Sequence, residues 1–210
     1  MDMNRAIDVV LVDVGGVIVP NAGRDDMESV ANTLGITPAE LGPLLYEWEA
    51  WYALSTGRIA EEAYWTMIGE RVGWEPAAVQ GLIHPIWEPA AVDTGVVALL
   101  RRISPPVRLA ILSNATLRLE DHLQRLGVIG LFAPIVNSAR VGLRKPDPAV
   151  FQHTLELLGV PAGAVLFVDD KRRNTDVAES LGIPSILFEG AGGLAAALAR
   201  HGVLSPDAAQ

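Results

Sequence analysis

Three aspartates stand directly after short apolar segments, where their carboxylates could hold a metal ion. Asp13 follows the segment IDVVLV, and Asp169 and Asp170 follow AVLFV. Carboxylates that lie close together repel each other unless a positive charge lies among them, and Mg²⁺ is a usual cation for oxygen ligands of this kind. A single aspartate at such a place could equally cap the next helix. Two such places in one sheet favour the metal site, because both would open onto the same crevice.

Other residues near the ends of predicted strands could bind an anion. They are two glycines, a serine, an asparagine and a lysine. Gly15 and Gly16 would let the backbone turn sharply and present N–H groups to an oxyanion, although a plain turn also explains them. Ser113 and Asn114 could donate hydrogen bonds to a phosphate oxygen. Lys145 lies in GLRKPDP, where two prolines restrict the backbone and so restrict where the cation can point.

These residues follow segments that have the pattern of buried strands. Five short apolar segments lack the alternation of a half-exposed strand, which favours a parallel sheet covered on both faces. Helical patterns that end at glycine lie between the later segments. Strand and helix therefore alternate, and the fold class is predicted as α/β with a doubly wound parallel sheet. The predicted strands are Ile7–Val12, Arg108–Leu112, Ile135–Val136, Ala164–Val168 and Pro184–Phe188, and the predicted helices are Thr116–Leu126, Pro148–Leu158 and Arg173–Leu181.

The segment from residue 20 to residue 90 has no convincing strand and is predicted to be a small helical cap domain. Helical periodicity is visible in Asp25–Leu34, Pro38–Leu54 and Glu61–Val72. An insert after the first strand would lie over the mouth of the sheet like a lid. The core domain is then expected to comprise residues 1–19 and 91–210. Four tryptophans are expected to build the core of the insert, with one or two of them free to line a pocket instead: Trp48, Trp51, Trp65 and Trp74.

Composition excludes several classes of function. The chain has 210 residues and a formal net charge of -9, which argues against nucleic acid as a partner. It contains no cysteine, so disulfides, thiolate chemistry and cysteine-based zinc sites are excluded. No apolar stretch approaches the ~20 residues of a membrane span, and the first residues do not have the pattern of a signal peptide. We therefore expect a cytoplasmic protein without a membrane partner, as a monomer or homodimer.

In order and spacing, four segments resemble the motifs of the haloacid dehalogenase-like (HAD) hydrolase superfamily. They are VVLVDVGGVIV, ILSN, SARVGLRKPDPAVF and VLFVDDKRRNTDVAESLGIPSILF, and together they span the predicted sheet from end to end. The segment ALSTGRIAEEAYW resembles the helical cap of the subgroup whose insert follows the first motif. The resemblance implies a HAD-like, Rossmannoid fold and a magnesium-dependent phosphatase of a small phosphorylated metabolite, with a sugar phosphate as one candidate.

The resemblance also implies a role for each site residue. Asp13 would attack phosphorus and form an aspartyl-phosphate, while Lys145 would offset the negative charge. Ser113 would bind the transferring phosphoryl group, with Asn114 and the Gly16 backbone nearby. The implied metal site consists of Asp13, the Gly15 carbonyl and Asp170, and it also includes Asp169, the residue before Asp170.

One position departs from the motif. The family usually carries a second aspartate two residues after the nucleophile, which protonates the leaving group and activates water, and here that position is Gly15. Such proton transfer contributes ~10² to 10⁴ in rate. Three explanations stay open: another acid or water substitutes, the leaving group is a good one, or activity is low. Asn174, where an aspartate often stands, lowers the local number of carboxylates further.

Two other functions therefore compete with the phosphatase. A 2-haloacid dehalogenase would attack carbon without a metal, but such enzymes typically carry an aromatic residue where this chain has Gly15. A non-catalytic binding or regulatory module would keep the pocket and turn over poorly.

Overall fold

The computed structural model describes residues 6–88 and 91–204 and contains one five-stranded sheet. The strand order is β3-β2-β1-β4-β5, and all neighbours are parallel. The strands are β1 (Val9–Val12), β2 (Arg108–Ser113), β3 (Ile135–Asn137), β4 (Val165–Asp169) and β5 (Ser185–Leu187). Each agrees with a predicted apolar segment, so the predicted fold class is confirmed.

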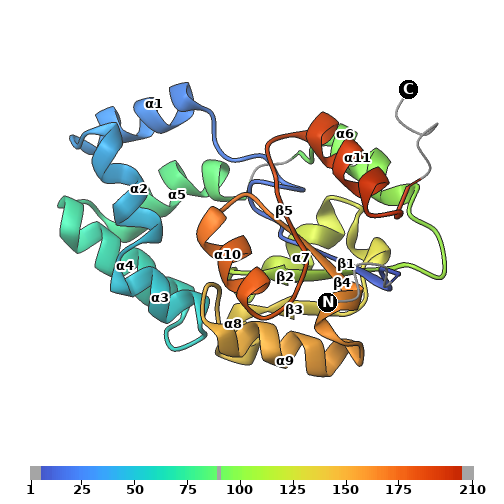
Figure 1. Cartoon of the computed structure of the whole chain (residues 1–210). Helices are drawn as coiled ribbons and strands as arrows, with labels where there is room; N and C mark the ends of the chain where they lie inside the picture. The colour runs from blue at the N-terminus through green and yellow to red at the C-terminus, as the bar shows by residue number, and fades with distance from the viewer. Residues whose placement is uncertain (1–5, 89–90, 205–210) are drawn as a thin grey trace.

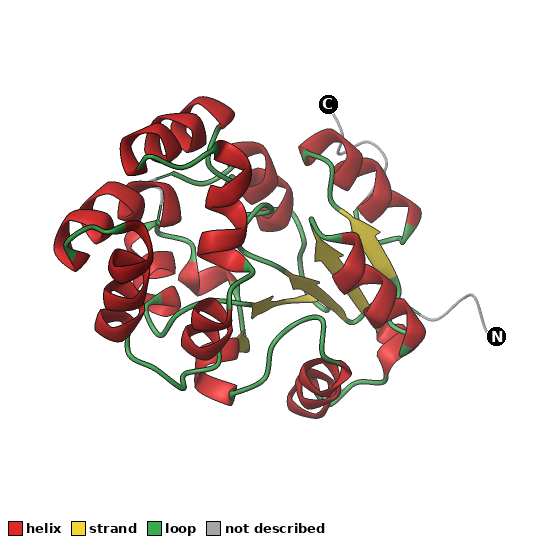
Figure 2. Cartoon of the chain, turned by 90° about the vertical axis from the view of Figure 1, so that its left-hand side faces the viewer, coloured by secondary structure: helices red, strands yellow, loops and turns green. Residues whose placement is uncertain are grey.

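Helices cover both faces of the sheet, as Figures 1 and 2 show. On one face the side chains of Val10 and Val12 pack with α6 (Thr94–Arg101), α7 (Leu119–Arg125) and α11 (Ala191–Arg200). On the other face those of Val9 and Leu11 pack with α9 (Pro148–Leu158) and α10 (Arg172–Ser180). Successive residues of β1 thus point into opposite apolar layers, which explains why the strand is apolar throughout. The remaining short elements are α8 (Ser138–Val141) and the 3₁₀ turns η1 (Ile129–Leu131) and η2 (Ala162–Ala164).

Five helices, α1 to α5, stand between β1 and α6 and form a group beside the sheet, on the left of Figure 1. We call this group the insert. It has a hydrophobic cluster of its own, to which helices along the whole insert contribute. The predicted boundary at residue 90 falls on residues 89–90, which lie outside the described part of the chain. The five helices are α1 (Arg24–Leu34), α2 (Pro38–Tyr46), α3 (Glu49–Ser55), α4 (Glu61–Val72) and α5 (Pro76–Trp87).

Aromatic rings fill the middle of the insert. Tyr64 stacks on Trp87 with ring centroids 5.2 Å apart, and Trp51 and Trp65 pack against Trp87 at 5.2 and 4.8 Å. Trp74 is instead exposed. Trp51 and Trp65 therefore lie in the predicted core, whereas Trp74 does not.

The structure corrects two predicted helices. Pro38–Leu54 is two helices, because Trp48 has an extended backbone (φ -78°, ψ 153°) that ends one helix and begins the next. Thr116–Leu126 begins only at Leu119, because the Thr116 hydroxyl accepts the N–H of Arg118 at 3.2 Å and forms a local turn. Among the described residues, no helix is long and apolar enough to cross a membrane.

Candidate active site

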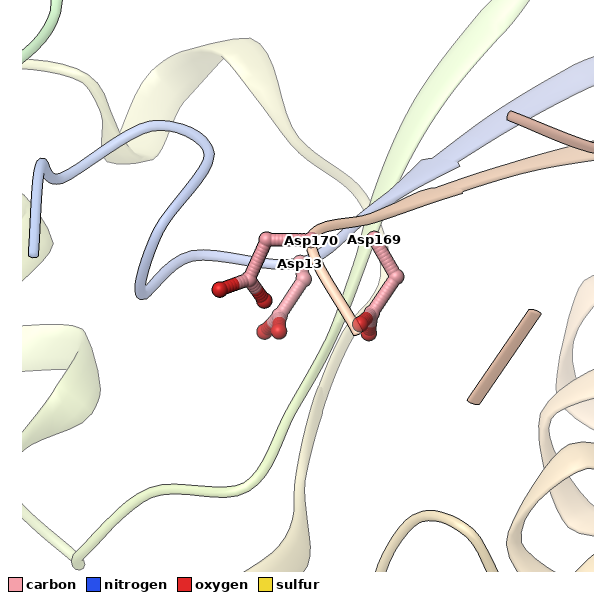
Figure 3. Close-up of side chains that lie close together, drawn as sticks. All are labelled: Asp13, Asp169 and Asp170. Atoms are coloured by element: carbon pink, nitrogen blue, oxygen red, sulfur yellow. The ribbon is translucent and has the colours of Figure 1, made fainter. Parts of the chain in front are cut away.

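The carboxyl ends of β1, β2 and β4 bring the predicted site residues together. Val12 pairs with both Ile111 and Val168 in register, so Asp13 and Asp169 leave the sheet side by side. Carboxylate oxygens of Asp13, Asp169 and Asp170 lie within 4.8 Å of one another. Figure 3 shows the three side chains gathered beyond the strand ends. The proximity expected of these aspartates is confirmed.

Lys145 lies between two of these carboxylates and is almost completely buried, with 1% of its surface exposed. Its Nζ is 2.8 Å from Oδ2 of Asp13 and 2.6 Å from Oδ2 of Asp169. Asn114 fixes the backbone of the lysine: its Oδ1 accepts the Lys145 N–H and its Nδ2 donates to the Lys145 carbonyl, both at 2.8 Å. The Asn114 side chain, predicted to lie near the phosphoryl group, is thus occupied in holding Lys145.

Asp169 has hydrogen-bond partners on both oxygens and is fully buried. Oδ1 accepts the N–H of Lys171 at 2.8 Å and the Nδ2 of Asn174 at 2.9 Å, while Oδ2 faces Lys145. Burial raises the pKa of Asp169, but the charge and hydrogen bond of Lys145 outweigh burial, and the pKa lies below its usual value. Asp169 therefore holds the lysine in place. Asn174, which in the family motif stands only where a carboxylate is often found, thus orients Asp169, a role that its motif position does not reveal.

The pKa of Asp13 is shifted in the opposite direction from that of Asp169. Burial raises the pKa of Asp13 to about 6, with Lys145 acting against the rise and Asp169 adding to it. The Asp13 Oδ1 accepts the N–H of Val14 at 2.7 Å. A divalent cation beside Asp13 would favour its charged form, so the electrostatics of the side chain fit a metal ligand.

Asp170 has a buried carboxylate oxygen that is suited to coordinate a metal ion. Its Oδ1 is buried and has no hydrogen-bond partner in the described residues, and its Oδ2 accepts only a 3.2 Å bond from Asn21. The Gly15 carbonyl takes no part in the bridge between Gly15 and Val19, which is made by other backbone groups. Two carboxylates and a backbone carbonyl are a set of oxygen ligands that suits Mg²⁺, so the residues fit the implied metal.

Gly16 makes the approach of Asp170 possible. Its φ is +82°, and a Cβ atom there would lie 2.3 Å from Oδ2 of Asp170. The Gly16 N–H, predicted to face an anion, instead donates to the Val19 carbonyl at 2.7 Å. The glycine is therefore needed for close packing and not for its N–H.

Gly16→Ala should consequently displace Asp170. We expect a loss of about 1–3 kcal/mol in the free energy of unfolding and Mg²⁺ binding about 10- to 100-fold weaker, measured by urea unfolding and titration calorimetry. Gly15→Ala is the matched control, because a Cβ there meets nothing within 4 Å. Equal effects of the two substitutions would contradict this role of Gly16.

A cavity of about 450 Å³ lies between the strand ends and the insert. Asp13, Ser113 and Lys145 line it from the sheet side. Three further cations also line it, namely Arg144, Lys171 and Arg173. Lys171 and Arg173 belong to the run KRR directly after Asp170, which is the sequence signal that could have identified them. The cavity thus carries positive charge beside the aspartates in a chain that is acidic as a whole.

Glu88 joins the insert to the sheet domain beside this cavity. Its carboxylate accepts a hydrogen bond from Nε of Arg118 at 3.0 Å. The same carboxylate lies 3.6 Å from Nδ1 of His122 and forms an ion pair with Arg125. Burial raises the pKa of Glu88, but the hydrogen bonds from His122 and Arg118 outweigh burial and hold the pKa at about 2. Arg118 also reaches Glu61 of the insert at 3.8 Å. These ion pairs connect the insert to the sheet domain beside the cavity.

Comparison with known proteins agrees with this geometry. The model for the haloacid dehalogenase-like hydrolases matches residues 7–182. The drimenol cyclase drtB of Aspergillus calidoustus is 28% identical over 184 residues, which are 85% of this chain but 33% of that protein, so the chain spans about a third of this relative. The sesquiterpene phosphatase astK of Aspergillus oryzae is 25% identical over 146 residues, which are 69% of this chain and 74% of that protein. A Bacteroides thetaiotaomicron HAD family enzyme, bt-2542, solved with magnesium and inorganic phosphate, has a TM-score of 0.70 at 20% identity, covering 86% of this chain and 93% of that one.

Proposed function

Because the chain belongs to the haloacid dehalogenase-like hydrolase family, we propose that it is a magnesium-dependent phosphatase that forms an aspartyl-phosphate on Asp13. The observation that carries this proposal is the arrangement around Asp13. A buried lysine lies on one side of the nucleophile, and on the other side Asp170 has a carboxylate oxygen without a hydrogen-bond partner in the part of the chain that the structure describes. A sesquiterpene phosphatase among the relatives and a structural neighbour solved with magnesium and phosphate support the same reaction class.

The cation would be held by Asp13, Asp170 and the Gly15 carbonyl. When bound, Mg²⁺ neutralises charge on the phosphoryl oxygens. Asp169 does not need to be a ligand, since both of its oxygens already accept hydrogen bonds. Its part in the proposal is to keep Lys145 beside Asp13.

The reaction has two steps, transfer of the phosphoryl group to Asp13 and hydrolysis of the aspartyl-phosphate. An Asp13 carboxylate oxygen attacks phosphorus, the bond from phosphorus to the ester oxygen breaks, and the alcohol leaves with a proton. Lys145 and the Ser113 hydroxyl stabilise the transferring group, as expected for a reaction that depends mostly on positioning and charge. Water then hydrolyses the aspartyl-phosphate and releases inorganic phosphate and Asp13.

The proton of the leaving alcohol comes from water in this proposal. Gly15 has no side chain, it is exposed, and it lines the cavity. Without a fixed acid there, esters with poor leaving groups lose up to the ~10² to 10⁴ that general acid catalysis contributes. An activated substrate such as acetyl phosphate is therefore the most sensitive first probe.

The test is phosphate release from acetyl phosphate and from a panel of phosphate esters that includes sugar phosphates. We expect turnover with Mg²⁺, none after complete chelation, and at least a tenfold loss in Asp170→Asn. Mg²⁺ at 100 times its Kd should also stabilise the wild-type fold by about 2.7 kcal/mol, a rise in Tm of about 5–10 °C, and the rise should vanish in Asp170→Asn.

Two results would overturn the proposal. Activity on a 2-haloacid that survives chelation would identify a dehalogenase instead. No phosphate release from any ester by folded protein that binds Mg²⁺ would identify a binding module.

A further inference from the structure

The cavity above Asp13 has two chemically different walls. The sheet side presents charged and polar groups at the strand ends, including Asp13, Ser113 and Lys145. The opposite wall comes from the insert helices α1, α2, α3 and α5. Its members are mainly apolar or aromatic: Met27, Pro43, Tyr46, Trp51, Ile86 and Trp87.

The aromatic part of this wall is held rigidly. Trp51 packs edge-on against Tyr46 with ring centroids 5.7 Å apart, and it packs on Trp87 at 5.2 Å. Trp87 in turn stacks on Tyr64, which is fully buried in the hydrophobic cluster of the insert. The apolar surface is therefore preformed and continuous with a packed core.

The wall offers few hydrogen-bonding groups to a substrate rich in hydroxyl groups. Its acidic residues are Glu47, which is exposed, and Glu88, whose carboxylate is already paired with Arg118 and Arg125. Its other polar atoms include the Tyr46 hydroxyl and the buried indole N–H of Trp87, which has no hydrogen-bond partner among the described residues. Sugar hydroxyls buried against tryptophan, isoleucine and methionine would lose their hydrogen bonds to water without replacement. A hydrocarbon chain gains by the same burial.

We propose that the substrate is the monophosphate ester of an apolar alcohol. The proposal rests on the phosphatase function above. The ester places its phosphorus at Asp13 and its chain against the wall from the insert.

A homologous series of n-alkyl phosphates, from ethyl to dodecyl and below the micelle concentration, tests the inference. The leaving group is the same throughout, so only chain burial changes. We expect kcat/KM to rise about fourfold for each added methylene while the chain still contacts the wall. The value for decyl phosphate should exceed that for glucose 6-phosphate at least about 100-fold. A kcat/KM independent of chain length, or a preference for the sugar phosphate, would overturn the inference.

Acetyl phosphate separates this inference from the proposed function. It needs the machinery around Asp13 but has no chain. Turnover of acetyl phosphate without any chain-length dependence would refute the apolar substrate alone. Failure with acetyl phosphate and with every alkyl phosphate would refute the phosphatase itself.

Two variants test whether the wall from the insert causes the dependence of kcat/KM on chain length. Met27→Gln keeps the length of a partly buried side chain that lines the cavity and makes it polar. It should lower kcat/KM for decyl phosphate about tenfold and leave that for acetyl phosphate unchanged. Leu157→Gln on α9, a residue 54% exposed and outside the cavity lining, is the control and should change neither. Equal kcat/KM for decyl phosphate in Met27→Gln and wild type would contradict the assignment of this wall.

Discussion

Asp13→Asn is expected to lower phosphate release by about 10⁴-fold or more, the scale of losing an enzyme nucleophile. An amide cannot form the acyl-phosphate bond that the proposed mechanism requires. The substitution keeps the size of the side chain and an oxygen that can accept the Val14 N–H. The fold should therefore persist, and the loss should appear in kcat. Steady-state kinetics with acetyl phosphate and circular dichroism of both proteins measure the two parts.

The intermediate offers a second readout that a structural defect would not mimic. Acid quenching of the wild type during turnover should trap a phosphoryl group on the peptide that contains Asp13, visible by mass spectrometry. The Asn variant should show none. Phosphorylation of any other residue, or retained turnover in a variant free of wild-type protein, would remove Asp13 from the role of nucleophile.

Lys145→Met is expected to be the most destabilising of the substitutions considered, by about 3–5 kcal/mol. The lysine is 1% exposed and separates two buried carboxylates, at 2.8 Å from Asp13 and 2.6 Å from Asp169. Removing its charge leaves these carboxylates buried without compensation. Urea unfolding at neutral pH gives the change in free energy.

A second substitution distinguishes this explanation from a simple packing defect. Lys145→Met combined with Asp169→Asn removes one of the stranded charges and should recover at least about 1 kcal/mol relative to the single variant. Lys171→Met is the control for losing a cation at this end of the sheet, because Lys171 is exposed and should change stability within about 0.5 kcal/mol. No recovery in the double variant would mean that charge burial is not the cause.

The part of the site most accessible to sequence analysis is the set of residues that end strands. Asp13 and Asp169 follow apolar segments, and parallel strands necessarily bring such ends to one edge. The motif around Lys145 predicts that this lysine belongs to the site. It does not predict that the lysine is buried between two carboxylates, because this depends on the side chain of Asn114. Asn114 is 31 residues away and holds the lysine backbone by two hydrogen bonds.

The insert was harder to predict than the sheet domain. Periodicity predicts the bounds of Glu61–Val72 without error, but it predicts a single helix where α2 and α3 stand and none at α5. Helix α5 carries prolines at its first position and in its last turn, and proline usually argues against a helix interior. The composition of the insert revealed its tryptophans, whereas which of them line the cavity depends on how helices far apart in sequence pack together.

Gly15 and Gly16 are adjacent but differ in whether the structure tolerates another residue type. Any side chain at position 16 would clash with Asp170. At position 15 a Cβ atom meets nothing within 4 Å, and the backbone lies outside the left-handed region. Aspartate codons differ by one base from two of the four glycine codons, and position 15 has room for a Cβ atom, so a single base change can gain or lose the proton donor that the family usually carries. Descendants of one ancestral scaffold could therefore differ in their acid catalysis while every other part of the site is inherited unchanged.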